Sequence, residues 1–215
     1  MATIGQNWED RAEEYAAEAL AEGTPTAWFD RIYAAGRRGE VGVPWDRDEP
    51  NPLLVEWAAG RSGTGRSALV VGCGLGKDSE FVGGLGYATT AFDVSGTAVA
   101  FVRERYPGSP VDYRVADLLD PPAGWSRAFD LVVEIFTVQA LPATVREQAV
   151  SNVAGFVAPG GTLLAISGIR EDGDPPRVAP PWLLTSADIE SCGTGGLSAV
   201  EIARVGGRWR AEFRR

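Results

Sequence analysis

From residue 67 onward, short apolar runs alternate with segments of helical periodicity. The apolar runs are rich in β-branched residues, and the first of them reads Ala68-Leu69-Val70-Val71. Such alternation is typical of βαβ units built around a parallel sheet. The pattern predicts strands at 68–71, 87–92, 111–115, 129–135, 161–167, 197–205 and 208–213, with helices at 78–85, 96–105, 142–157 and 186–191.

The first 66 residues follow a different pattern, which is helical in character but poorly periodic and rich in aromatic residues. Glycine, proline and charged residues dominate 40–51 and indicate an ordered loop. Pro52 then opens a helix expected at 52–59, because proline is favoured in a first helical turn. We expect an N-terminal helical cap over residues 1–66 of a single domain, 1–215.

These elements predict an α/β fold with a doubly wound, mostly parallel seven-stranded sheet and helices on both faces, the Rossmann-like arrangement. The chain has 215 residues, of which 45% are hydrophobic and 23% charged, as expected for one compact domain. It has no apolar run of about 18 residues and no apolar signal core. We therefore expect a cytoplasmic protein that does not bind membranes.

Charge and residue usage exclude several classes of site. The net charge is −9, and the arginines are scattered singly, so we expect no nucleic-acid partner. The chain has no histidine, which excludes histidine-based triads and zinc sites with histidine ligands. Its two cysteines, Cys73 and Cys192, are too few for a metal cluster, so we expect no metal.

Glycines at 72, 74 and 76 follow the first predicted strand directly. Glycine lets the backbone turn tightly and approach a ligand closely, with the N-terminus of the next helix behind the turn. A nucleotide-like ligand fits such a turn. The alternative is a turn that only packs closely.

Asp93 ends the second predicted strand. A carboxylate at this place can accept two hydrogen bonds from a ribose diol that lies over the switch point of the sheet. A strand-end aspartate is also a common helix N-cap, but Ser95 is available for that role. The glycine turn and Asp93 together favour a ligand that contains a nucleoside.

Two ligand classes use this arrangement, dinucleotides and S-adenosylmethionine. A dinucleotide site has its third glycine where this sequence has Lys77. Asp78 and Glu80 would repel a pyrophosphate, whereas they can lie near a sulfonium or an ammonium group. Lys77 is the only lysine, so the chain has no Tyr-x-x-x-Lys pair of a nicotinamide-dependent oxidoreductase. We predict S-adenosylmethionine as the cofactor, with S-adenosylhomocysteine as its product.

Five segments then resemble class I S-adenosylmethionine-dependent methyltransferases: Leu69-Val70-Val71-Gly72-Cys73-Gly74-Leu75-Gly76, Phe92-Asp93-Val94-Ser95, Ala116-Asp117-Leu118-Leu119, Phe129-Asp130-Leu131-Val132-Val133 and Ala158-Pro159-Gly160-Gly161-Thr162-Leu163. The resemblance implies a cofactor-binding core over 67–170, followed by a substrate-side loop and closing strands over 171–215.

The same resemblance implies roles for single residues. Gly72, Gly74 and Gly76 would line the methionine part of the cofactor and Asp93 would hold the ribose. Cys73, Asp78 and Val94 are further expected cofactor contacts within or beside these motifs. Asp117 with Leu118 would meet the adenine, and Glu134 with Ile135 would close over the cofactor. Two simpler readings stay open: Asp117 caps a turn, and Glu134 is a solvated strand end.

Three N-terminal segments resemble the cap of the thiopurine, thiol and halide methyltransferases: Trp28-Phe29-Asp30-Arg31-Ile32-Tyr33, Val43-Pro44-Trp45-Asp46 and Asn51-Pro52-Leu53-Leu54. Later in the chain, Pro180-Pro181-Trp182-Leu183-Leu184-Thr185 resembles the post-strand loop of the same group. This resemblance implies that Trp45 covers the methyl donor and that Asp46 supports the pocket. The alternative for Trp45 is a packing role. Asn51 departs from the group, which often has histidine there.

Four residues are candidates for contact with the substrate: Tyr33, Asp46, Gln139 and Trp182. The loop 170–182 is expected at the carboxyl ends of the strands, where it would form a substrate lid with Trp182 as a wall. A proline-rich surface loop is the alternative. Gln139 is expected to face the pocket. The simpler alternative is that Gln139 is only a polar residue at the start of a helix.

Methyl transfer from a sulfonium is an in-line displacement, which gains most from alignment of the reacting atoms and from exclusion of water. No catalytic residue is assigned, although Asp46, Glu134, Tyr15 and Tyr33 are candidates should a proton need removal. Soft nucleophiles such as thiols, selenols, halides or metalloids suit a chain without histidine. The alternatives are O- or N-methylation of a natural product, or a regulator that binds the cofactor without catalysis. The protein is expected to be a monomer or a homodimer.

Overall fold

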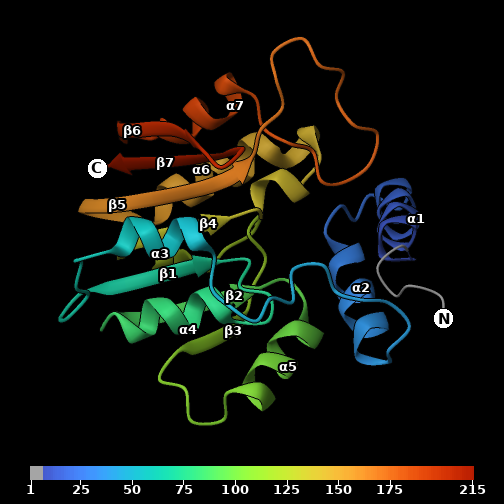
Figure 1. Ribbon diagram of the computed structural model, residues 1–215, viewed down its shortest axis with the longest axis horizontal. Helices are drawn as coiled ribbons and strands as arrows, with labels where there is room; N and C mark the ends of the chain where they lie inside the picture. Colours follow the sequence, from blue (N-terminus) through green and yellow to red (C-terminus); the bar gives the residue numbers. More distant parts are fainter. Residues whose placement is uncertain (1–6) are drawn as a thin grey trace.

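The computed structural model, which describes residues 7–215, is built on one seven-stranded sheet (Figure 1). The strand order is β3-β2-β1-β4-β5-β7-β6, and all neighbours are parallel except that β7 runs antiparallel to β5 and β6. The strands are β1 Ser67–Val71, β2 Ala88–Asp93, β3 Asp112–Val115, β4 Phe129–Ile135, β5 Val157–Gly168, β6 Ser198–Val205 and β7 Arg208–Arg214. The predicted doubly wound fold is confirmed.

The helices are α1 Asn7–Ala21, α2 Ala27–Arg37, α3 Pro52–Ala58, α4 Lys77–Gly84, α5 Gly96–Arg105, α6 Ala143–Phe156 and α7 Ser186–Glu190. Three short 3₁₀ turns, η1 Ala123–Trp125, η2 Val138–Ala140 and η3 Ser191–Gly193, were not predicted, because three residues carry no periodicity. No helix within residues 7–215 has both the length and the apolar character that a membrane crossing requires.

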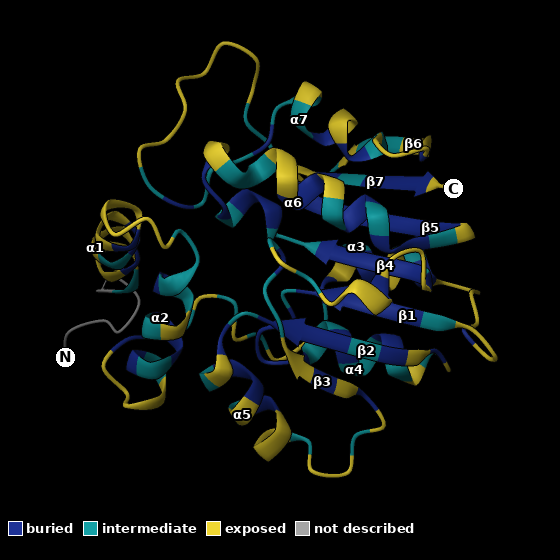
Figure 2. Ribbon diagram, turned by 180° about the vertical axis from the view of Figure 1, so that it is seen from behind, coloured by how far each residue is buried: buried dark blue, intermediate teal, exposed yellow. Residues whose placement is uncertain are grey.

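Two apolar clusters pack the faces of the sheet. On one face, Val70 and Val133 pack with Val82 of α4 and Val102 of α5. On the other face, Val132 and other strand residues pack with α6, η1 and η3. Figure 2 shows the central strands as a mostly buried layer between helices whose outer surfaces are exposed, whereas the edge strands β3 and β6 are largely exposed. Burial on both faces explains why the central parallel strands β1 and β4 read as nearly continuous apolar runs.

The strand order reverses between β1 and β4, and the carboxyl ends of β1, β2 and β4 meet at this switch point. Ligands of open α/β sheets bind in the crevice at such a point. The helices α1 and α2 lie beyond these strand ends (Figures 1 and 2). Asp30 of α2 ties the cap to the core, because its Oδ1 accepts hydrogen bonds from Ser95 Oγ at 2.6 Å and Thr97 N at 3.0 Å.

Candidate functional site

A cavity of about 980 Å³, counted with its open mouth, lies at the carboxyl ends of the parallel strands. Its walls come from α2, the loop before α3, the glycine turn, and the segments that follow β2, β3 and β4. Of the residues predicted from the sequence, it is lined by Tyr33, Trp45, Gly72, Cys73, Gly74, Gly76, Asp78, Asp93, Val94, Asp117, Leu118 and Ile135.

The glycine turn needs its glycines for conformation and for space. Gly72, Gly74 and Gly76 have φ values of +61°, +50° and +90°, in the left-handed region that side chains with a Cβ avoid. A Cβ at Gly72 would collide with the side chain of Thr137, and one at Gly74 would lie 2.9 Å from Tyr33 Oη. The turn therefore leaves its backbone open to the cavity.

Asp93 lies at the end of β2 and is 6% exposed. Its Oδ2 accepts the N–H of Gly74 at 2.9 Å, and its Oδ1 accepts the N–H of Ser95 at 3.0 Å. Burial raises the pKa of Asp93 to about 6, against the opposing effect of these two N–H donors. Each carboxylate oxygen keeps lone-pair capacity for a further donor from the cavity. Ser95 caps α5 by accepting the N–H of Ala98, as predicted.

Asp117 follows β3 and has the turn-capping role that was its simpler alternative, while its contact with adenine stays a prediction. Its Oδ1 accepts the N–H of Leu119 at 2.8 Å, so it caps a local turn. It also lines the cavity, as does Leu118, which is 6% exposed. This end of the cavity offers an apolar wall with a carboxylate beside it.

Tyr33 and Trp45 form the cap's side of the cavity above the glycine turn. Their rings meet edge to face, with centroids 5.7 Å apart. Burial raises the pKa of Tyr33 well above its usual value, with a further contribution from Asp93, so the phenol is neutral. The indole N–H of Trp45 is buried beside the Tyr33 ring and lies outside hydrogen-bond geometry with every acceptor among residues 7–215. An unpaired buried donor costs free energy unless a ligand satisfies it.

Asp78 lines the cavity, but its charge already has a partner in the protein. Arg47 Nη2 lies 2.7 Å from Asp78 Oδ2, and the N–H of Asn51 donates to Asp78 Oδ1 at 2.6 Å. Arg47, which also lines the cavity, was not predicted from the sequence. The pair fixes the loop before α3 against the start of α4.

Glu134 does not line the cavity, which corrects the expectation that it closes over the cofactor. Its Oε1 accepts the N–H groups of Thr137 and Val138 at 2.7 and 2.8 Å, so the side chain caps η2. The residue is 1% exposed, and burial raises its pKa to about 7. Because side chains alternate along β4, its neighbour Ile135 faces the cavity instead.

Three residues expected to contact the substrate do not line the cavity, and their substrate contact stays a prediction: Asp46, Gln139 and Trp182. Asp46 forms an ion pair with Arg105 of α5, with 2.8 Å between Oδ1 and Nη1. The Oε1 of Gln139 accepts the N–H of Gly168 at 2.5 Å. These polar groups find partners in the protein and hold loops in place.

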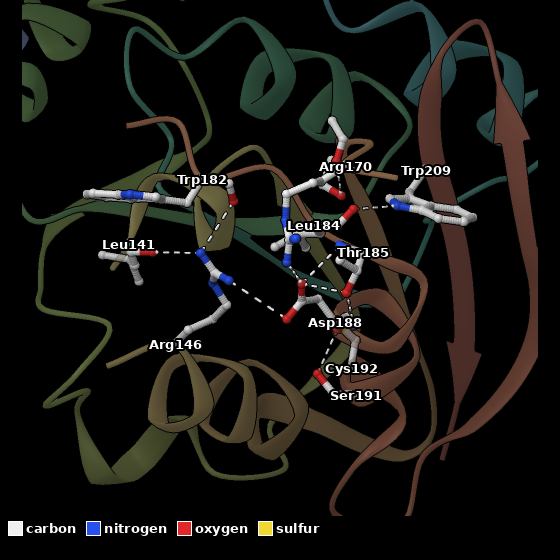
Figure 3. Close-up of polar contacts among 12 residues, drawn as sticks. Leu141, Arg146, Arg170, Trp182, Leu184, Thr185, Asp188, Ser191, Cys192 and Trp209 are labelled. Atoms are coloured by element: carbon white, nitrogen blue, oxygen red, sulfur yellow. Dashed lines mark hydrogen bonds and ion pairs between the residues drawn. The ribbon is translucent and has the colours of Figure 1, made fainter. Parts of the chain in front are cut away.

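Arg146 of α6 anchors the segment around Trp182 (Figure 3). Its Nη2 donates to the carbonyl oxygens of Leu141 at 3.2 Å and Trp182 at 3.3 Å, and its Nη1 lies 3.7 Å from Asp188. Asp188 in turn forms a capping box with Thr185 at the start of α7. The segment that carries Trp182 is thus joined through its backbone to α6. The lid role of 170–182 stays a prediction.

Ten further residues line the cavity and were not named as site residues from the sequence. Four lie within or beside the predicted motifs: Leu75, Lys77, Phe92 and Ala116. The other six belong to the cap or follow β4: Thr26, Phe29, Phe136, Thr137, Ala140 and Leu141. Most of these six are apolar, and of them only Phe29 lies in a segment for which the sequence analysis found a family resemblance. The one available signal was position, because Phe136 and Thr137 directly follow a predicted strand end.

Comparisons with known proteins identify the core. Residues 68–161 match the family model described as a methyltransferase domain. Among solved structures, one described under the conversion of a disulfide bond into a thioacetal group during echinomycin biosynthesis superposes with a TM-score of 0.69 and 24% identity, over 87% of this chain and 93% of that one. The core has the class I methyltransferase fold.

Two more methyltransferase structures extend the likeness beyond the core. The N-methyltransferase NodS from Bradyrhizobium japonicum, solved with S-adenosylhomocysteine, has a TM-score of 0.65 at 22% identity, over 85% of this chain and 96% of that one. The 1,6-didemethyltoxoflavin N1-methyltransferase from Burkholderia thailandensis has a TM-score of 0.66 at 19% identity, over 95% and 90%. At such identities the likeness concerns the methyltransferase fold.

The similar sequences are named ubiquinone biosynthesis O-methyltransferase. One from Xanthomonas axonopodis pv. citri is 32% identical over 129 residues, 55% of this chain and 53% of the relative. Another from Paramagnetospirillum magneticum is 31% identical over 170 residues, 77% of this chain and 60% of the relative. The chain thus spans about half to three fifths of these relatives. The resemblance to the thiopurine, thiol and halide methyltransferases stays a prediction.

Proposed function

We propose that this chain is an S-adenosylmethionine-dependent methyltransferase that acts on a small molecule. The observation that carries the proposal is one continuous cavity that joins the glycine turn, Asp93 and Asp117 at the switch point of a methyltransferase fold. S-adenosylmethionine has an amino-acid part, a ribose and an adenine. The cavity walls offer matching groups in that order.

The residues present fit this cofactor. The ribose hydroxyls would donate to Asp93, whose Oδ2 and Oδ1 accept the N–H groups of Gly74 and Ser95 and keep lone-pair capacity for further donors. The adenine would lie against Leu118, with Asp117 beside it. The methionine part would lie along the exposed backbone of Gly72 to Gly76, where a Cβ would fill the space.

Tyr33 and Trp45 would bind the carboxylate of the cofactor's methionine part. The Trp45 indole N–H is a buried donor without a partner, and the neutral Tyr33 phenol lies next to it above Gly74. Both groups donate hydrogen bonds, and a carboxylate is a strong acceptor. A ligand carboxylate at this place would remove the cost of the unpaired indole N–H.

When bound, the cofactor supplies an electrophilic methyl group on a sulfonium. The protein's contribution is to hold donor and acceptor in line and to keep water out. The cap would keep water out, because Phe29, Tyr33 and Trp45 cover the cavity with aromatic surface. Burial raises the pKa of Cys73, so this lining thiol is neutral and is not a competing nucleophile.

The acceptor is proposed to be a soft nucleophile such as a thiol, a selenol, a halide or a metalloid, because the chain has no histidine to serve as a general base. A second candidate is O-methylation, which the names of the ubiquinone O-methyltransferase relatives favour. Cytoplasmic location, the lack of nucleic-acid partners and the monomeric or dimeric state stay predictions.

The test is incubation with S-adenosylmethionine labelled in its methyl group and a panel of thiols, halides, phenols and catechols. A methylated thiol or halide supports the soft-nucleophile proposal, and a methylated phenol or catechol supports O-methylation. S-adenosylhomocysteine should raise Tm in a concentration-dependent manner. Cofactor binding without turnover of any acceptor favours a non-catalytic regulator, whereas an unchanged Tm contradicts the cofactor assignment.

A further inference from the structure

Phe136 has a backbone conformation that side chains rarely adopt. Its φ is +62°, and Arg127 is the one other non-glycine residue with positive φ in the described part of the chain. For a bulky residue this conformation is strained and persists only when its surroundings hold it. Such strain is often kept at functional sites, so its place in the molecule matters.

Contacts on both sides hold this conformation. The Phe136 N–H donates to the carbonyl oxygen of Ile166 in β5 at 2.9 Å. The next residue, Thr137, donates its N–H to Glu134 and its hydroxyl to the carbonyl oxygen of Val71 at 3.1 Å. The segment is therefore fixed to β4, β5 and β1 at once.

The strained turn changes which residues line the cavity. In an extended strand, successive side chains point to opposite faces. The positive φ at Phe136 ends this alternation, and the three consecutive residues Ile135, Phe136 and Thr137 all line the cavity. The guanidinium of Arg208 lies 5.8 Å from the centroid of the Phe136 ring and limits where the ring can move.

The sheet order separates the two parts of the cavity. The residues proposed to hold the cofactor follow β1, β2 and β3, which form one half of the sheet. Phe136 follows β4, on the other side of the switch point. The space in front of β4 is therefore left for the methyl acceptor. Its walls carry no ionisable side chain: Phe29, Phe136, Thr137, Ala140 and Leu141.

We propose that Phe136 is a specificity-determining residue whose ring, turned into the cavity by the strained turn, packs against a flat aromatic acceptor. The proposal rests on the proposed methyltransferase function and names the acceptor class of that site. Aromatic rings pair favourably in offset or edge-to-face geometry, and an apolar wall rejects charged acceptors. The backbone strain at Phe136 is then the free-energy cost of directing its ring toward the acceptor.

The experiment compares Phe136→Gly, Phe136→Ala and a control, Phe81→Ala. Phe81 packs half-buried on the same apolar cluster as Phe136 but does not line the cavity. Each protein is saturated with S-adenosylhomocysteine and titrated with thiophenol and with ethanethiol by calorimetry, at a mildly acidic pH where thiophenol, the more acidic of the two, is also a neutral thiol. Tm of each unloaded protein is also measured.

The wild type and Phe81→Ala should bind thiophenol more tightly than ethanethiol. Both Phe136 variants should lose about 3- to 10-fold of this preference while their affinity for S-adenosylhomocysteine stays within about twofold. Phe136→Gly should melt about 2–4 °C above Phe136→Ala, because glycine accepts the positive φ without strain.

Two kinds of failure are distinguishable. If the wild type does not bind S-adenosylhomocysteine, the proposed function itself fails. If that product binds but the wild type shows no preference for thiophenol, or the Phe136 variants keep it, the role of Phe136 is overturned. Equal melting temperatures of Phe136→Gly and Phe136→Ala would show that the backbone at position 136 is not strained.

Discussion

The carboxylate of Asp93 accepts the backbone N–H of Gly74 at 2.9 Å, which joins the end of β2 to the turn that follows β1. Its other oxygen accepts the N–H of Ser95 at the start of α5. One buried side chain thus holds two cavity-lining segments together while it faces the cavity itself. Asp93 is therefore expected to matter for both the shape of the site and its ligand.

Replacing Asp93 with asparagine should weaken binding of S-adenosylhomocysteine by about 1.5–3 kcal/mol, because hydrogen bonds to a charged acceptor are lost. Tm should also fall, since one end of the amide carries hydrogens and cannot accept a backbone N–H. Calorimetric titration and thermal melting measure the two effects. Asp112→Asn, at an exposed ion pair with Arg114, is the matched control and should change neither. Unchanged affinity of Asp93→Asn would reject the ribose role.

The affinity for S-adenosylhomocysteine should depend on pH through Asp93. In the free protein the pKa of Asp93 is about 6, raised by burial. Ribose hydroxyls that donate to the carboxylate favour its charged form, so the complex has a lower pKa. Affinity should be constant above about pH 7 and fall as the pH drops through 6, by up to about tenfold per pH unit.

Calorimetry between pH 5 and 8 measures this dependence. Asp93→Asn should flatten the profile. Glu134→Gln should leave it in place, because Glu134 titrates near the site but does not line the cavity. If Glu134→Gln flattens the profile and Asp93→Asn does not, the pH dependence comes from Glu134, and the assignment to Asp93 is wrong.

Trp45→Phe should separate ligand binding from stability. The indole N–H has no partner among the described residues, so its removal should leave Tm unchanged or slightly raised. If this N–H binds the cofactor's carboxylate, affinity for S-adenosylhomocysteine should fall by about 1.5–3 kcal/mol. Decarboxylated S-adenosylhomocysteine provides the control ligand, because it should bind both proteins equally. If Trp45→Phe lowers the affinity for S-adenosylhomocysteine and for its decarboxylated form equally, the loss comes from packing of the indole and not from its N–H.

The sequence predicted the elements that have a clear hydrophobic periodicity or that begin and end at typical capping and turn residues. The helix predicted at 96–105 coincides with α5, and the Ser95 cap was anticipated because a serine precedes an apolar helical run. The glycine turn and Asp93 were found because their chemistry depends on backbone and strand position, which the local sequence determines.

The residues around β4 could not be predicted in the same way. Glu134 lies at a strand end, and η2 determines whether it faces the cavity or a neighbouring turn. A turn of three residues has no periodicity from which the sequence could predict it. The positive φ of Phe136 is imposed by contacts with β5 that are distant in sequence. Gln139 looked like a cavity residue because the sequence does not show that Gly168 takes its side chain.

Glu134 gives a stability prediction with a defined sign. Its pKa in the folded protein is about 7, raised by burial above the usual value of 4.5, and its Oε2 has no partner among residues 7–215. Between these two values the unfolded chain has lost the proton that the folded chain still binds. The free energy of unfolding should therefore fall as the pH rises from about 4.5 to 7.

Glu134→Gln removes this dependence while it keeps an oxygen that can accept the N–H groups of Thr137 and Val138. The variant should match the wild type at pH 5 and exceed it at pH 8 by about 1–3 kcal/mol, since no charge is then buried. Urea denaturation at the two pH values measures the difference. Glu134→Ala, which loses the cap of η2, should be less stable than Glu134→Gln at both. A constant difference between wild type and Glu134→Gln across the range would mean that burial does not penalise the charged carboxylate.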